Sequence, residues 1–101
     1  MKSLRVANYK ITKGTFSEVA EEAKSGMLKT FRDQPGFIRY GLADTGEGTC
    51  LSISLWESHA QADAAAPVAA TWVRDHLGDK IELRSNVVGD LAFYEGVPAT
   101  V

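Results

Sequence analysis

Histidine, tyrosine and tryptophan side chains are the groups in this sequence best suited to act on a small organic molecule. His76 ends an apolar helical stretch, where an imidazole that titrates near neutral pH could act as a base. The same position suits a plain surface cation, because positive charge complements the C-terminal end of a helix. Trp72, one helical turn earlier, could form a flat wall for an aromatic ligand or could pack in the core. Both alternatives remain open for both residues.

Phenols and small side chains complete the candidate site. Tyr40 and Tyr9 could each donate a hydrogen bond to a ligand oxygen. Ala65 and Ala69 share an apolar helix face with Trp72, and the space beneath them could be a ligand cavity or simply close helix–sheet packing. We predict catalytic roles for His76 and Tyr40, and substrate-binding roles for Trp72, Tyr9, Ala65 and Ala69.

The remaining chemistry-bearing residues form no recognisable constellation. His59 and His76 lack carboxylates or thiols at metal-ligand spacing around them. Cys50 has no activating partner near it in the sequence. Arg5 and Arg39 could each pair with an anion, although a rim charge contributes little. We therefore predict no metal and no cofactor.

Composition excludes several classes of protein. The 101 residues suit one domain spanning 1–101, and the net charge of −2 comes from scattered charges without a Lys/Arg run, so we expect no nucleic-acid partner. No stretch approaches the roughly 20 apolar residues that a membrane span needs, and MKSLRVANYK lacks the apolar run of a secretory signal. One cysteine fits a reducing compartment, so we expect a cytoplasmic protein.

The order of expected elements is strand, helix, strand, strand, helix, strand. Capping boxes at Thr15/Glu18 and Ser58/Gln61 open the two helices, of which the second runs to Leu77 and should be split or kinked at Pro67. The expected strands are 4–12, 37–43, 49–57 and 86–95, with 79–85 left open. This pattern predicts an α+β, ferredoxin-like βαββαβ fold with a four-stranded antiparallel sheet.

Several strands carry apolar residues on both faces. Leu4 and Val6 alternate with Ala7 and Tyr9 in the first strand, and in 49–57 we expect Trp56 on the face away from the helices. A sheet face without helices should be polar if it meets water. We therefore expect a homodimer that buries this face, the alternative being a monomer with a few exposed apolar groups.

Three turns and strand ends resemble the antibiotic biosynthesis monooxygenase family: Lys13-Gly14, Pro35-Gly36-Phe37 and Leu55-Trp56-Glu57-Ser58. The resemblance covers about residues 4–95. It implies a dimeric α+β barrel with a pocket between sheet and helices in each protomer. It also implies cofactor-independent oxygenation of a small aromatic or quinol-type compound. A dimeric module that binds such a ligand, or serves in stress, without turning it over is the alternative, because fold does not imply function.

A haem-degrading branch of the same superfamily is a second alternative, which we disfavour. That branch uses an Asn, a Trp and a His, and this chain has Asn8, Trp72 and His76. Aligned on the shared turns, the branch's Asn would fall at Ala7, so that Asn8 points to the opposite face. His76 misses its place by one residue as well.

Overall fold

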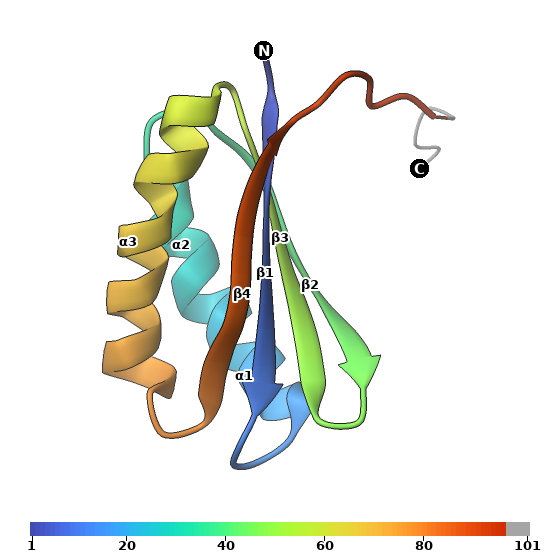
Figure 1. The fold of residues 1–101 in the computed structure, drawn as a ribbon. Coiled ribbons are helices and arrows are strands. Elements are labelled where there is room, and N and C mark those ends of the chain that lie inside the picture. Colours follow the sequence, from blue (N-terminus) through green and yellow to red (C-terminus); the bar gives the residue numbers. More distant parts are fainter. Residues whose placement is uncertain (97–101) are drawn as a thin grey trace, which may run out of the picture.

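The computed structural model describes residues 1–96, and Figure 1 shows their path. Its elements follow in the order β1 (Ser3–Ile11), α1 (Phe16–Glu22), the π-helical turn η1 (Ala23–Met27), α2 (Leu28–Arg32), β2 (Phe37–Gly46), β3 (Thr49–Trp56), α3 (His59–Leu77) and β4 (Ile81–Asp90). α1, η1 and α2 form one continuous helical segment.

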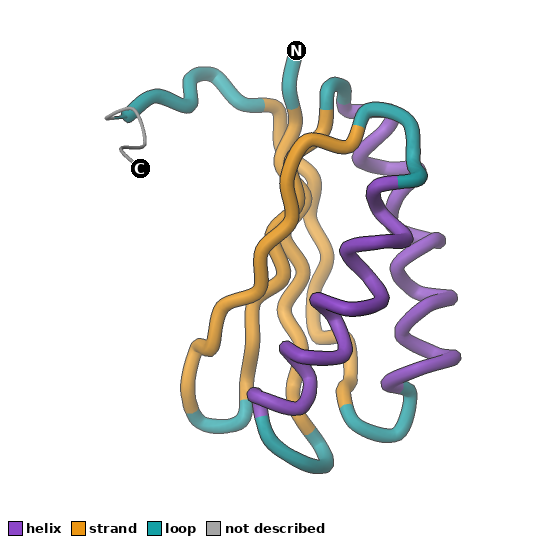
Figure 2. The backbone as a smooth tube through the Cα atoms, turned by 180° about the vertical axis from the view of Figure 1, so that it is seen from behind, coloured by secondary structure: helices purple, strands orange, loops and turns teal. Residues whose placement is uncertain are grey.

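The four strands form one antiparallel sheet in the order β2-β3-β1-β4. Both helical segments cover the same face of this sheet, as Figures 1 and 2 show from opposite sides. The α+β, ferredoxin-like prediction is therefore confirmed. The other sheet face carries no helix, and we call it the open face.

Both helices begin at the predicted N-cap residues, Thr15 and Ser58, although the Gln61 Oε1 finds no hydrogen-bond partner among the described residues and so does not close the second capping box. The Thr15 hydroxyl oxygen accepts a hydrogen bond from the Glu18 amide at 3.3 Å, and the Ser58 hydroxyl oxygen accepts one from the Gln61 amide at 3.2 Å. These bonds satisfy N–H groups that a helix start leaves without an intrahelical partner. They fix where each helix begins, and so which side chains turn toward the sheet.

The core lies between the helices and the helix-facing side of the sheet. Trp56 is fully buried there, its indole N–H donating to the Ser54 hydroxyl at 2.8 Å, and Phe31 packs edge-on against it with ring centroids 5.3 Å apart. Our placement of Trp56 on the open face is therefore wrong. Cys50, Ser52 and Ser54 share the buried parity of β3, so its polar residues face the helices.

Two further expectations differ from the structure. The last strand is 81–90 rather than 86–95, because β1 begins at Ser3, which pairs with Asp90. Beyond that pair, the Leu91 amide donates one further hydrogen bond, to the Lys2 carbonyl at 2.9 Å, outside the strands. Pro67 does not split the second helix, since α3 is continuous across it. Buried residues on both sides, Ala65 and Ala69, hold the two halves against the sheet.

Within residues 1–96, no helix is long and apolar enough to cross a membrane.

Candidate functional site

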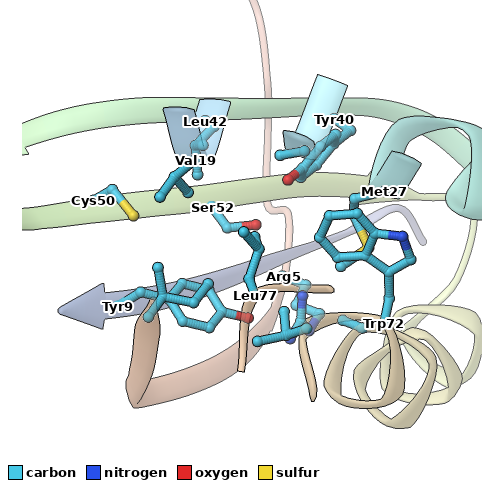
Figure 3. Close-up of a pocket in the computed structure, with 14 residues that line it drawn as sticks. Arg5, Tyr9, Val19, Met27, Tyr40, Leu42, Cys50, Ser52, Trp72 and Leu77 are labelled. Carbon is cyan, nitrogen blue, oxygen red and sulfur yellow. The ribbon is translucent and has the colours of Figure 1, made fainter. Parts of the chain in front are cut away.

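A small cavity lies between the sheet and the helices, and Figure 3 shows its walls. Its volume of about 20 Å³ exceeds the minimum of roughly 10–15 Å³ that one water molecule requires. Its walls come from β1, β2, β3, β4 and both helical segments: Arg5, Tyr9, Val19, Ala23, Met27, Tyr40, Leu42, Cys50, Ser52, Ala69, Trp72, Val73, Leu77 and Ile81. The lining is mainly apolar, with a few polar groups that converge from three neighbouring strands.

The phenols of Tyr9 and Tyr40 are two of these polar groups. Burial raises the pKa of Tyr40 to about 12, although the Ser52 hydroxyl and the Arg5 charge act in the opposite direction. The Tyr40 hydroxyl therefore stays protonated at physiological pH and can donate a hydrogen bond. Tyr9 is 6% exposed and stands two residues beyond Ala7 on the same face of β1.

Arg5 is the third polar group, and its environment is unusual for an arginine. The residue is 2% exposed, and its Nε has no hydrogen-bond partner in the part of the chain that the structure describes. None of the ion pairs among residues 1–96 involves it. A guanidinium stays charged at any physiological pH, and burying an unpaired charge costs several kcal/mol. The cavity wall thus holds a permanent positive charge that pairs with no carboxylate of residues 1–96.

The Trp72 indole forms one wall of the cavity, and the π-helical turn η1 makes room for it. A Cβ atom at Gly26, in the middle of that turn, would approach the Trp72 Cζ2 atom to 2.5 Å, which is too close for any side chain. Met27, at the end of the turn, faces the cavity beside the indole (Figure 3). π-Helical turns inside α-helices are frequent at functional sites.

A wider groove of about 530 Å³ adjoins the cavity between α3 and β4. The two spaces share four wall residues, Arg5, Tyr9, Val73 and Ile81. The rest of the groove is lined by Ala66, Pro67, Ala70, Arg74, Gly78, Leu83 and Asn86. Ligand sites commonly measure about 300–1,000 Å³, so the groove has the size for an organic ligand and the cavity does not.

The family model for antibiotic biosynthesis monooxygenases matches residues 4–66. The match spans more than half of the chain. The protein belongs to the antibiotic biosynthesis monooxygenase family. A comparison with curated protein sequences gave no match.

Solved structures of the same fold include SnoaB, a cofactor-independent oxygenase from Streptomyces nogalater. It is 16% identical, with a TM-score of 0.69 over 97% of this chain and 98% of SnoaB. HapK from Hahella chejuensis is 12% identical, with a TM-score of 0.70 over 99% of this chain and 100% of HapK. MupZ from Pseudomonas fluorescens is 13% identical, with a TM-score of 0.67 over 86% of this chain and 69% of MupZ. At these identities the comparison establishes the fold alone.

The structure brings four of the six predicted site residues together. Trp72, Tyr9, Tyr40 and Ala69 all line the cavity. Ala65 is buried at 1% exposure but is not among the lining residues, so it provides close helix–sheet packing. Trp72 and the wall residues that follow it lie beyond the part of the chain that the family model matches.

His76 lies outside the cavity. It is exposed, and its ring packs against the Trp72 indole with centroids 4.7 Å apart, over a shallow surface hollow that includes Thr30 and Asp75. His76 is not among the residues that line the cavity, and its role as a base stays a prediction.

Asn8 and Cys50, two residues considered in the sequence analysis, both have structural roles outside the chemistry of the cavity. Asn8 is exposed on the open face, where its amide donates to the Ser85 hydroxyl at 3.0 Å, so it points away from the cavity as its parity predicts. Cys50 is buried, and burial, with a contribution from the Asp44 charge, raises the pKa of its thiol. Neither residue supplies an ionised group to the cavity.

His59 joins the ends of three elements away from the cavity. Its Nδ1 lies 2.8 Å from Asp90 Oδ1 and its Nε2 lies 3.3 Å from Asp63 Oδ2, while the Ser3 hydroxyl donates to Asp90 at 2.7 Å. The hydrogen bond to Asp90 is the main cause that raises the pKa of His59. Among residues 1–96, no group of three or more His, Cys, Asp or Glu residues has the arrangement of a metal site.

Some of the lining residues that sequence reasoning missed come from the strand that was misplaced. Ile81, Leu83 and Asn86 line the two spaces from β4, whose first half, 81–85, was left unassigned. Arg5 was noticed only as one of two arginines able to meet an anion. Its signal in the sequence is that it shares the parity of Ala7 and Tyr9, the residues expected to face the helices.

Proposed function

We propose that this protein is a cofactor-independent monooxygenase that acts on a small aromatic or quinol-type compound. The observation that carries the proposal is the site between sheet and helices, where Trp72 offers a ring face and Tyr9 and Tyr40 offer phenol groups. Its membership of the antibiotic biosynthesis monooxygenase family supports the reaction class. The substrate within that class is not specified by either observation.

An anthrone illustrates the chemistry that such a site must assist. Its ring CH₂ loses two hydrogens and gains one oxygen atom from O₂, and the second oxygen atom leaves with those hydrogens as water. The substrate supplies all the electrons, so the balance requires no added reductant. The protein must hold a flat ring, favour its deprotonated and electron-rich form, and exclude water from the reacting carbon.

Each of these tasks has a candidate residue. The ring itself lies in the wider groove, and the Trp72 indole provides an apolar surface for the edge of the ring, with its oxygen, that enters the small cavity. Tyr40, protonated because burial raises its pKa to about 12, donates a hydrogen bond to a developing oxyanion. Tyr9 lies where cavity and groove meet and can donate to the same oxygen.

Oxygen consumption with a panel of anthrones and quinols tests the proposal. Wild-type protein is expected to consume one O₂ per product formed, and Tyr40→Phe is expected to lower the rate about 10²-fold or more, as loss of one oxyanion donor does elsewhere. Tyr94→Phe is the matched control, because Tyr94 is exposed beyond β4. Absence of uptake above the spontaneous rate for the whole panel contradicts catalysis and favours a ligand-binding module.

We also propose that two copies pair through the open face of the sheet. Leu4, Val6, Ile53 and Leu55 lie on this face partly exposed, and Val87 is 59% exposed. An apolar face of this kind favours association. Light scattering at micromolar concentration is expected to give twice the mass of the chain, and Ile53→Lys to give the monomer, whereas a monomeric wild type contradicts the proposal.

A cytoplasmic location is proposed from the free thiol. Cys50 is the single cysteine of the sequence and is buried and unpaired. Free thiols persist in a reducing compartment. Fractionation of cells that express the tagged chain measures this location. Recovery of the tag in the membrane or extracellular fraction contradicts it.

A further inference from the structure

We propose that Arg5 binds an anionic oxygen of an aromatic ligand, and that this ligand lies in the groove between α3 and β4. The inference rests on the proposed function for the ligand's aromatic character, but its test measures binding and needs no turnover. The anionic oxygen can be a carboxylate on the ring or an ionised phenol or enol of the ring itself.

The first argument is the uncompensated charge. Arg5 is 2% exposed, and its Nε has no hydrogen-bond partner within residues 1–96. Buried charges in proteins are normally paired or coordinated. Because Arg5 remains charged without such a partner, a ligand anion is the group whose arrival would satisfy it. Guanidinium groups bind carboxylate oxygens with two parallel hydrogen bonds, which suits this role.

The second argument is the charge of the surroundings. The lining of cavity and groove includes two arginines, Arg5 and Arg74, and no Asp or Glu. The Asn86 amide and the Tyr9 hydroxyl add hydrogen-bond donors to the same walls. Such a lining favours a negatively charged ligand over a neutral or cationic one.

The third argument is size. The small cavity of about 20 Å³ cannot admit a fused ring system, whereas the adjoining groove of about 530 Å³ can. Arg5 belongs to the walls of both, so its charge reaches a ligand seated in the groove. Ala66 and Ala70 leave the α3 side of the groove shallow and apolar, as a flat ring requires.

This placement removes the need for a protein base. The walls of cavity and groove contain no His, Asp or Glu. A positive charge within about 4–6 Å lowers the pKa of an acidic group by about 1–3 units. For a phenol beside Arg5, the O–H bond breaks, the electron pair stays on oxygen, and the proton passes to water in the open groove. Arg5 thus favours the electron-rich form of the ring without itself taking the proton.

Calorimetric titration with three naphthalene probes tests the inference. 2-Naphthoate carries a fixed anion, 2-naphthol an ionisable oxygen, and 2-naphthalenemethanol a neutral one. We expect Arg5→Met to weaken 2-naphthoate binding about 10–100-fold, the usual effect of losing a charge-assisted hydrogen bond, with 2-naphthalenemethanol changed less than about threefold. Arg5→Lys keeps the charge and should recover part of the loss, while Arg32→Met alters an exposed arginine on α2 and should change nothing.

Absorbance of bound 2-naphthol against pH separates the two sources of the anion. A bound naphthol that ionises at lower pH on wild type than on Arg5→Met identifies the ring oxygen as the anion that Arg5 favours. A large effect on 2-naphthoate without that shift identifies a carboxylate. Ala70→Leu, which fills the groove and not the cavity, should weaken both ligands, whereas Ala64→Leu, an exposed position of α3 outside the groove, should weaken neither.

Equal binding of 2-naphthoate by wild type and Arg5→Met overturns the inference. Equal loss of the charged and neutral probes overturns it as well, because a structural role for Arg5 would produce that pattern. Absence of oxygen uptake would leave these binding results intact, so the two proposals fail separately.

Discussion

Replacement of Arg5 by methionine should make the unliganded protein more stable. The guanidinium is 2% exposed, its Nε lacks a hydrogen-bond partner, and no ion pair among residues 1–96 neutralises it. Methionine has similar length and flexibility and fills irregular apolar space. The variant therefore removes the penalty of an unsatisfied buried group, about 1–3 kcal/mol, while it keeps most of the packing.

Urea unfolding at fixed protein concentration measures this effect. With a slope of about 1–3 kcal/mol per molar, the stabilisation corresponds to a rise in midpoint of about 0.3–3 M at unchanged slope. Arg32→Met, at an exposed position, should stay within about 0.5 kcal/mol of wild type. An anionic probe at a concentration that saturates wild type should then narrow the gap, because the weaker binding of Arg5→Met stabilises that variant less than wild type.

A loss of stability in Arg5→Met would refute the reasoning. A drop of more than about 1 kcal/mol would mean that the guanidinium supports the fold through bonds that outweigh its desolvation. The charge would then be a structural feature, and a ligand anion would no longer be needed to explain it.

Three other perturbations have defined outcomes. The hydrogen bond to Asp90 raises the pKa of His59 above 6.5. The stability that protonated His59 contributes to the fold is therefore fully present below pH 6.5 and is lost as the pH rises through the folded-state pKa. The difference in urea midpoint between wild type and His59→Gln should shrink over that pH range. Burial raises the pKa of Tyr40 to about 12, so absorbance at 295 nm should show one phenol that ionises near that pH in the folded protein and is missing in Tyr40→Phe. Gly26→Ala places a Cβ 2.5 Å from Trp72 Cζ2 and should cost about 1–3 kcal/mol with a shifted tryptophan emission; wild-type stability and emission would contradict that packing.

The sequence predicts the elements of this fold well where local signals agree. Side chains at Thr15 and Ser58 bond to amides three residues later, and those bonds place the helix starts where the capping boxes predict. The order of elements then specifies the sheet topology, because few arrangements of strand–helix–strand connections are sterically allowed.

The last strand could not be placed in the same way. The apolar run Leu91–Tyr94 resembles a strand as strongly as 81–90 does, and the choice depends on where β1 offers hydrogen bonds. β1 begins at Ser3, so pairing ends at Asp90, and Phe93 lies exposed beyond it. Strand pairing is non-local, and periodicity within one segment carries no information about it.

The face of Trp56 was mispredicted for a related reason. Alternation in β3 separates leucine and isoleucine from serine and cysteine, and apolar residues are the usual choice for a core. The structure turns the serines and Cys50 inward and leaves Leu51, Ile53 and Leu55 on the open face. When a strand packs against helices on one face and carries apolar residues on the other, both of its faces resemble buried ones. Alternation alone then cannot tell which set of residues faces the helices.

The alanines of α3 show how one helix can close a core and still border a binding space. Ala62 and Ala65 are at most 1% exposed and let the N-terminal half of the helix approach the sheet closely. One turn later Ala69 lines the cavity, and Ala66 and Ala70 line the groove. Small residues on the inner face bring the backbone near the sheet, while small residues on the neighbouring face leave the groove open beside Arg5. The same residue type therefore has opposite consequences on adjacent faces of α3, and only the position of β4 decides which alanines pack and which leave space.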